Sequence, residues 1–193
     1  MKPQPHLQAL VPLAPGFEEL EAIAILDVLR RAGIHTLIAA VEGTPAVTGS
    51  HNITVQADEP LAAAAARPWH AIVLPGGMPG ATNLARSTLL LELLRRTAAS
   101  GGITAAVCAA PLALHAAGLL QGRRFTCFPS VQPELPGGIC TGERVEVDGT
   151  LVTGKAAGAA VEFALAIVEA LGLREQAEGL RAGMFVQQPP PVI

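Results

Sequence analysis

A cysteine stands in the stretch AAVCAAP, between two pairs of alanines and three residues before Pro111. Cys108 has two interpretations. Free cysteine is among the most buried residue types, so the thiol can simply fill space as a small apolar side chain. Alternatively, a strand that turns sharply into a helix would project the side chain above a sheet, as nucleophile elbows do. Unpaired N–H groups at the start of that helix would favour a thiolate, and the small neighbours permit a tight turn.

Acidic residues open the first predicted helix, in the stretch GFEELE. Glu21 lies in line with Val28 rather than on the outer face of that helix. A carboxylate on a partly buried face needs a partner, and a protonated Glu21 could donate a hydrogen bond to a Cys108 thiolate. The alternative is that Glu18, Glu19 and Glu21 only complement the positive end of the helix dipole. The residues alone leave both interpretations open.

Two glycines follow another predicted strand, in the sequence Pro75-Gly76-Gly77. In open α/β sheets, ligands bind beyond the carboxyl ends of the strands. This turn, the GFEELE stretch and Cys108 all fall at that edge. The backbone N–H groups of Gly77 and Ala109 would then converge on an oxyanion, as hydrolase-type sites require. The chemistry that this arrangement indicates is nucleophilic attack by a thiol.

Strands and helices alternate along the chain, with short connections between them. The buried strands are unbroken apolar runs, which is typical of a parallel sheet covered on both faces. We predict strands at 7–13, 36–41, 71–77 with its glycine turn and 103–108, helices at 18–34, 89–101, from 111 onward and at 159–172, and hairpins at 47–58 and 144–154. This order predicts one α/β domain over residues 1–193, a doubly wound, mostly parallel sheet with helices on both faces, in a three-layer sandwich. The tail QQPPPVI is predicted to form no regular structure.

The composition excludes several classes of function. Half of the residues are hydrophobic, 15% are charged and the net charge is −3, which predicts a packed globule without the basic patch that nucleic-acid binding requires. Three cysteines without regular spacing make neither a disulfide framework nor a zinc site, and they favour a reducing cytoplasm. The N-terminus is a poor signal peptide. The uncharged segment 101–120 has the length of a membrane span, but we interpret it as a buried strand followed by a helix.

The motifs GFEELE, LPGG, AAVCAAP and VEFALAIVEALG occur in an order that resembles the ThiJ/PfpI superfamily, in its DJ-one/YajL-like branch. The resemblance covers nearly the whole chain. It implies a flavodoxin-like fold, a homodimer, and a reactive cysteine at the elbow with a glutamate beside it. Carried over by position, the cysteine is Cys108, the glutamate is Glu21, and the oxyanion donors are Gly77 and Ala109. We expect no cofactor and no metal.

Two positions depart from the pattern of the enzymatic members that this chain resembles. Ala109 stands where many of them have a histidine directly after the cysteine, and Phe128 stands where others have a histidine before a proline. His115 lies about 10 Å further along the predicted helix from Cys108, beyond hydrogen-bond reach. Glu21 is therefore the only candidate proton shuttle for the thiol.

The predicted site supports two main hypotheses. In the first, Cys108 attacks a small reactive carbonyl such as methylglyoxal, in a glyoxalase- or deglycase-like reaction, and Glu21 handles the proton. In the second, the protein is a stress-protective redox sensor or chaperone without steady-state turnover, and an oxidant converts Cys108 to a sulfinate held by Glu21 and the two amides. A third hypothesis, a flavin-binding flavodoxin, is disfavoured because GFEELE would repel a phosphate.

Three further side chains have no assigned chemistry. Cys127 and Cys140 lie in or near an irregular stretch, and we interpret them as unreactive thiols. The alternative is that either one resolves an oxidised Cys108 as a disulfide, which requires Cα atoms within about 7 Å. His51, in the polar hairpin, would reach the site only from a partner subunit.

Overall fold

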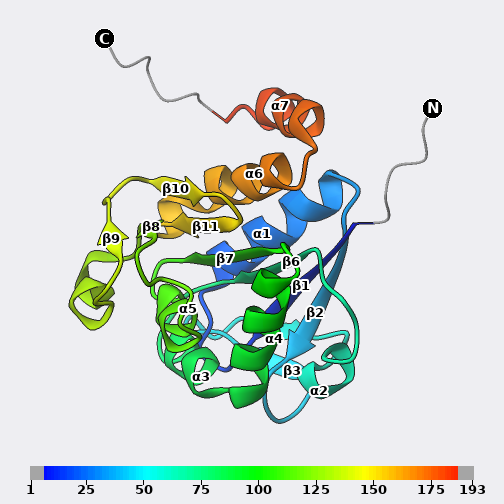
Figure 1. Cartoon of the computed structure of the whole chain (residues 1–193). Coiled ribbons are helices and arrows are strands. Elements are labelled where there is room, and N and C mark those ends of the chain that lie inside the picture. Colours follow the sequence, from blue (N-terminus) through cyan, green and yellow to red (C-terminus); the bar gives the residue numbers. More distant parts are fainter. Residues whose placement is uncertain (1–6, 187–193) are drawn as a thin grey trace.

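A seven-stranded sheet forms the centre of the computed structural model, which describes residues 7–186 (Figure 1). Its strands are β1 (Gln8–Leu13), β2 (His35–Ala40), β5 (Glu59–Pro60), β6 (Ala71–Leu74), β7 (Ile103–Val107), β10 (Val145–Asp148) and β11 (Leu151–Gly154). They lie in the order β10-β11-β7-β6-β1-β2-β5. All pairings are parallel except the one between β10 and β11. The chain winds outward from β1 in both directions, so the carboxyl ends of β1, β6 and β7 meet at one edge, where this fold places ligands.

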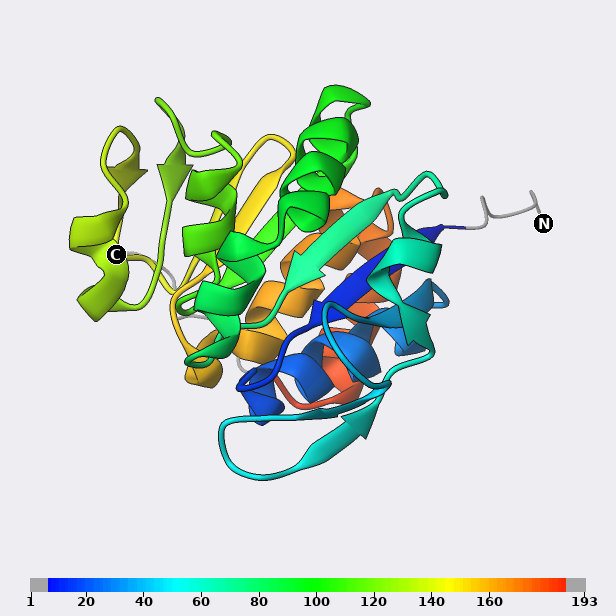
Figure 2. The ribbon, with the colours of Figure 1, turned by 90° about the horizontal axis from the view of Figure 1, so that it is seen from below.

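Helices cover both faces of the sheet (Figure 2). The two helices α1 (Glu19–Arg31) and α6 (Ala160–Ala170) pack against one another on one face, and α7 (Arg174–Gly183) packs on α6. The opposite face carries α2 (Leu61–Ala64), α3 (Gly80–Arg86), α4 (Thr88–Ala99) and α5 (Pro111–Ala116). The result is the three-layer arrangement that the alternation of strands and helices predicts.

The sheet separates two hydrophobic cores. Successive side chains of a strand point to opposite faces, so Leu10 belongs to the core under α2–α5 and Val11 to the core under α1 and α6. In β7, Ala106 and Val107 are divided in the same way. This double burial explains why the strands carry unbroken apolar runs instead of an alternating pattern.

Two small sheets lie outside the central one. An antiparallel hairpin of β3 (Ala46–Thr48) and β4 (Thr54–Gln56) projects near the start of α1. A parallel pair of β8 (Arg124–Phe125) and β9 (Ile139–Cys140) flanks the 3-10 helix η1 (Pro129–Glu134), at the end of the molecule opposite β2 (Figure 2). A second 3-10 helix, η2 (Ala157–Ala159), leads into α6.

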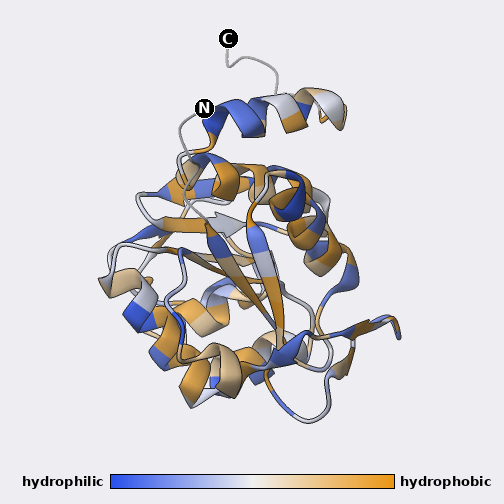
Figure 3. Ribbon diagram, turned by 90° about the vertical axis from the view of Figure 1, so that its right-hand side faces the viewer, coloured by the Kyte–Doolittle hydropathy of each residue, from blue (hydrophilic) through white to orange (hydrophobic). Residues whose placement is uncertain are grey.

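The predicted fold class is confirmed. The segment 101–120 forms β7 and α5, and no helix within residues 7–186 is long and apolar enough to cross a membrane. The predicted tail 187–193 and the first six residues lie outside the described part of the chain. Hydrophobic residues line the central strands, whereas α7 is mostly hydrophilic (Figure 3) and buries only Ala177.

Helix α1 is apolar on more than its inward face. Ile25 and Val28 are fully buried, but Leu20 and Ile23 are 60% and 48% exposed. The core between α1, α6 and the sheet is already filled by other side chains. The apolar pattern of this helix therefore includes two side chains, Leu20 and Ile23, that the described part of the chain leaves exposed to solvent.

Candidate active site around Cys108

Cys108 occupies a sharp turn between β7 and the start of α5. Its backbone has a φ of +62°, which is uncommon for a residue other than glycine and marks a constrained position. The N–H of Cys108 donates to the carbonyl of Gly154 at 2.9 Å, and its own carbonyl accepts from the N–H of Phe128 at 2.8 Å. Pro111 opens α5 at its first turn, where a missing N–H costs nothing. These contacts hold the elbow from both sides.

Glu21 reaches this elbow from α1. Its side chain is fully buried, and its Oε2 accepts a hydrogen bond from the N–H of Gly76 at 2.7 Å. The Cys108 thiol lies close enough to this carboxyl to lower its pKa as a hydrogen-bond donor. Its Oε1 is buried and has no hydrogen-bond partner among residues 7–186. A buried charged oxygen without a donor is costly, so the surroundings favour the protonated carboxyl.

The amide donors predicted from the sequence lie where they can act on sulfur. The backbone N–H groups of Ala109 and Gly77 lie close enough to the Cys108 sulfur to lower the pKa of the thiol as hydrogen-bond donors. Gly77 has a φ of +89°, which turns the chain after β6 toward the elbow. Gly76 fits between the side chains of Cys108 and Glu21, since a Cβ there would lie 2.8 Å from Cys108 Cβ and 2.9 Å from Glu21 Oε2. The structure thus brings Cys108, Glu21 and both amides together, and it adds Gly76, whose contact with Glu21 the sequence analysis missed.

Burial dominates the electrostatics of the pair. It raises the pKa of Glu21 to about 7, with the Gly76 amide opposing this effect and the charge of Glu18 adding to it. Burial, followed by the Glu21 charge, raises the pKa of the Cys108 thiol to about 12, while the amides of Ala109 and Gly77 lower it. The Glu21 charge opposes ionisation of the thiol, whereas the neutral thiol, as a hydrogen-bond donor, favours ionisation of the carboxyl and lowers its pKa. The pair therefore releases its first proton near pH 7 and holds the second well above pH 9.

No histidine faces this pair within the described residues in the positions where the enzymatic pattern has one. Ala109 is a buried member of the elbow, and Phe128 is 42% exposed. His115 lies half-buried on α5, and His51 lies on the hairpin, bound to another carboxylate. Glu21 remains the candidate proton shuttle.

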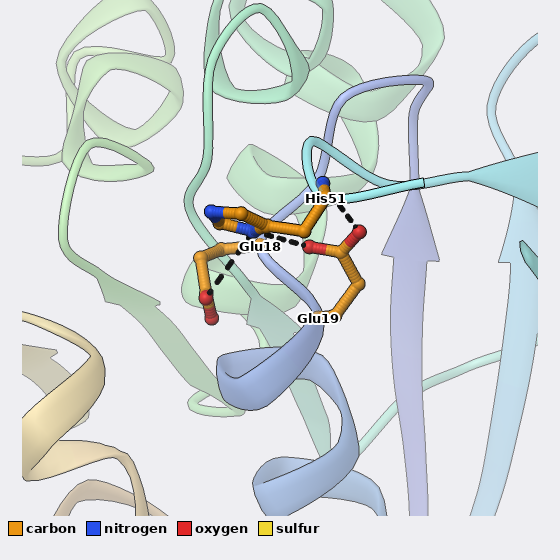
Figure 4. Close-up of side chains that lie close together, drawn as sticks. All are labelled: Glu18, Glu19 and His51. Carbon is orange, nitrogen blue, oxygen red and sulfur yellow. Dashed lines mark hydrogen bonds and ion pairs between the residues drawn. The ribbon is translucent and has the colours of Figure 1, made fainter. Parts of the chain in front are cut away.

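The three glutamates of GFEELE have three different roles. Glu18 caps α1 by accepting from the N–H of Glu21 at 2.7 Å. Glu19 is turned toward the β3–β4 hairpin, where its carboxylate accepts from the N–H groups of His51 at 2.6 Å and Ile53 at 3.3 Å. Its Oε2 also lies 2.9 Å from Nδ1 of the His51 ring, which sits between Glu18 and Glu19 (Figure 4). The interpretation that all three only complement the helix dipole is therefore incomplete.

The Glu18–Glu19–His51 cluster is held together by its own hydrogen bonds. Burial alone would raise the pKa of Glu19, but the ring and backbone of His51 outweigh this effect and hold it at about 2. Hydrogen bonding and attraction to Glu19 raise the pKa of His51. Their ligand atoms lie within 4.8 Å of one another, the distance range of a metal site. Because both oxygens of Glu19 already accept hydrogen bonds, we interpret the cluster as the clasp that fastens the hairpin to α1.

Glu21 makes stability depend on pH. Its pKa in the folded chain lies above the ordinary value of 4.5, so the stability that it contributes is complete below about pH 4.5 and is lost as the pH rises through 7. The difference corresponds to roughly 3 kcal/mol. We measure the free energy of unfolding in urea for Glu21→Gln and for the unmodified protein. Between pH 4 and pH 8.5, the difference between the two should change by about 3 kcal/mol in favour of the variant. If the free energies of unfolding of Glu21→Gln and of the unmodified protein changed in parallel with pH, this prediction would be contradicted. Glu92→Gln, on the exposed side of α4, is the matched control.

The chain is similar to known proteins over most of its length. The model of the DJ-1/PfpI family matches residues 7–170. Protein dj-1beta of Drosophila melanogaster is 40% identical over 92% of this chain and 96% of its own. A protein of Caenorhabditis elegans named glutathione-independent glyoxalase DJR-1.2 is 34% identical over 89% of this chain and 92% of its own. The structure of oxidized DJ-1 from Toxoplasma gondii superposes with a TM-score of 0.91 at 37% identity, covering 94% of this chain and all of that one. With a family model that matches most of its length, and relatives that it matches nearly end to end, the chain belongs to the DJ-1/PfpI family.

Proposed function

We propose that this chain is a DJ-1-type stress-protective protein whose Cys108 thiol reacts with oxidants and with small reactive carbonyls. The observation that carries the proposal is the contact between a thiol at a constrained elbow and a fully buried carboxyl, with two amide N–H groups on the sulfur. After the pair loses its first proton, the negative charge can lie on sulfur while Glu21 keeps a proton and donates it to the thiolate. The amides of Gly77 and Ala109 favour that distribution.

Oxidation by a peroxide requires only this thiolate. The sulfur attacks the O–O bond, which breaks to leave a sulfenate and an alcohol or water. A second peroxide adds a second oxygen in the same way, so one thiol and two peroxides give one sulfinic acid and two molecules of reduced peroxide. The sulfinate oxygens would then accept from Gly77, Ala109 and a protonated Glu21. The oxidized state of the Toxoplasma gondii structure supports this chemistry by likeness.

Reaction with a 2-oxoaldehyde such as methylglyoxal uses the same groups. The thiolate would add to the aldehyde carbon, and the two amides would stabilise the oxyanion that forms. Glu21 would then move a proton from that carbon to its neighbour, giving a thioester that water hydrolyses, so that the net reaction adds one water to the oxoaldehyde. The name of the Caenorhabditis elegans relative supports this branch.

The second candidate is redox sensing without steady-state turnover. Ala109 and Phe128 supply no imidazole, so Glu21 must serve every proton transfer of the carbonyl reaction. Oxidation requires no such sequence of transfers.

For the setting of either function, we propose a homodimer in the cytoplasm. A groove of about 680 Å³ beside Leu20, Ile23 and Ile53 supports association through the uncovered side of α1.

Cys108→Ala tests the proposal. During a peroxide titration of the reduced protein, intact mass and peptide mapping are expected to show two added oxygen atoms at Cys108. In the variant this addition disappears, and any consumption of methylglyoxal falls to the uncatalysed rate because the nucleophile is gone. Cys140→Ala, which removes a half-buried thiol outside the elbow, is the matched control. It should keep both the oxygen addition at Cys108 and any consumption of methylglyoxal.

Selective oxidation of Cys108 without carbonyl consumption would assign the redox role alone. The proposal fails if peroxide adds oxygen equally to all three cysteines and if carbonyl consumption, where present, survives Cys108→Ala.

A further inference from the structure

The other two cysteines meet on one side of the small β8–β9 sheet. Phe125 in β8 is the register partner of Cys140 in β9, and the N–H of Thr141 donates to the Phe125 carbonyl at 2.8 Å. Cys127 lies two residues after Phe125. Side chains two apart on an extended chain share a face, and register partners also lie on the same face. The side chains of Cys127 and Cys140 are therefore directed to the same side.

Packing agrees with this register. Cys127 is 2% exposed and belongs to the core that contains Phe125, and Cys140 packs against that core while remaining partly accessible. Cys140 also contributes to raising the pKa of Cys127, which agrees with the two thiols being neighbours. Two neighbouring thiols, one shielded and one reachable from solvent, form an arrangement that a peroxide can oxidise in two steps.

We propose that Cys127 and Cys140 form a redox-active dithiol that closes to an intramolecular disulfide when the protein meets a peroxide. The accessible Cys140 sulfur attacks the peroxide, which breaks at its O–O bond and leaves a sulfenic acid and one water. Cys127 then attacks the Cys140 sulfur, the S–O bond breaks, and the hydroxyl leaves with the thiol proton as a second water. In total, two thiols lose two electrons and one hydrogen peroxide is reduced to two waters.

The environment assigns the two roles. Burial is the largest cause that raises the pKa of the Cys127 thiol, to about 12, and the neighbouring Cys140 adds to it. A buried neutral thiol is a poor first nucleophile toward a peroxide in solution. It nevertheless packs on the same core as Cys140, next to the sulfur that becomes electrophilic. Cys140 is thus the peroxidatic thiol and Cys127 the resolving one.

A disulfide here would connect β9 to the chain directly beside the elbow. Cys127 precedes Phe128, whose N–H holds the carbonyl of Cys108. Closing the bond would also enclose η1 in a covalent loop and restrict the segment that supports the elbow. The disulfide itself needs neither Cys108 nor Glu21, so it can be tested without the proposed function.

The experiment uses the full chain carrying Cys108→Ala, reduced and then treated with hydrogen peroxide. Remaining thiols are alkylated, and the protein is analysed by intact mass and by non-reducing peptide mapping. We expect a loss of two hydrogen atoms, no alkylation, and a cross-linked pair of peptides that contain Cys127 and Cys140. Reduction with dithiothreitol should restore two alkylatable thiols.

Two control variants separate this disulfide from other products. Adding Cys140→Ala should leave Cys127 alkylatable at the same peroxide dose, and adding Cys127→Ala should give an oxygenated Cys140 instead of a cross-link. Full alkylation of both cysteines after peroxide would overturn the proposal, as would stable oxygen addition without a cross-link or a disulfide between two chains. Because Cys108 is absent from every variant, these outcomes are independent of its chemistry.

Discussion

Glu21→Ala is expected to slow the alkylation of Cys108 by iodoacetamide roughly 50-fold at pH 7. In the unmodified protein the carboxyl–thiol pair releases its first proton near pH 7, and the proposed site places the resulting charge on sulfur. Without the carboxyl, the half-buried thiol has no partner to take or return its proton and keeps a pKa of about 9 or above, at which only about 1% is ionised at pH 7. Peptide mapping by mass spectrometry resolves Cys108 from the other two thiols.

Glu21→Gln and Glu92→Ala make this experiment specific. Glutamine keeps an acceptor for the Gly76 N–H and a donor for sulfur but cannot exchange a proton, so its rate should fall between those of the alanine variant and the unmodified protein. Glu92→Ala removes an exposed carboxylate from α4 and should change nothing. An alkylation rate that is the same in Glu21→Ala and in the unmodified protein would contradict the role given to Glu21.

Gly77→Ala is expected to cost about 2 to 6 kcal/mol of stability and to weaken the effect of the Gly77 amide on sulfur. Its φ of +89° strains any residue with a Cβ, by about 1 to 3 kcal/mol. The added carbon would also overlap the backbone of Phe17 and Glu18, and forcing atoms into a packed region costs about 1 to 3 kcal/mol more. Urea unfolding measures the loss, and Cys108 alkylation at pH 7 measures the damage to the site.

Gly33→Ala is the matched control for that strain. Gly33 has a similar φ of +80°, but a Cβ there would meet nothing within 4 Å. We expect only the conformational cost, about 1 kcal/mol, and an unchanged rate of Cys108 alkylation. Equal losses of stability in the two variants would show that the turn at Gly77 is not closely packed against the loop before α1.

Much of the fold and the centre of the site can be predicted from local patterns. Unbroken apolar runs identify buried parallel strands because both of their faces are covered, as Leu10 and Val11 illustrate. The elbow is predictable because a cysteine between alanines follows one such run and Pro111 follows it. Glu21 is predictable as an inward residue because it shares a helical line with Val28. In each case, the information lies within one element or at its end.

Contacts between distant segments are not predictable in this way. The direction of Glu19 depends on where the β3–β4 hairpin lies, and nothing near Glu19 in the sequence distinguishes it from Glu18. The meeting of Cys127 and Cys140 depends on the register of two very short strands. A polar hairpin that follows an acidic helix start was the only available signal for the clasp, and it does not specify which carboxylate closes it.

The pH dependence of Cys108 alkylation in the unmodified protein tests the proposed site most directly. The rate follows the fraction of thiolate, so its midpoint reports when sulfur becomes charged. The carboxyl–thiol pair predicts a rise with a midpoint near pH 7, where the pair releases its first proton, and a shift to pH 9 or above in Glu21→Ala. A midpoint at or above pH 9 in the unmodified protein would mean that the proton leaves the carboxyl alone, that Cys108 stays a neutral buried thiol, and that the proposed chemistry is wrong.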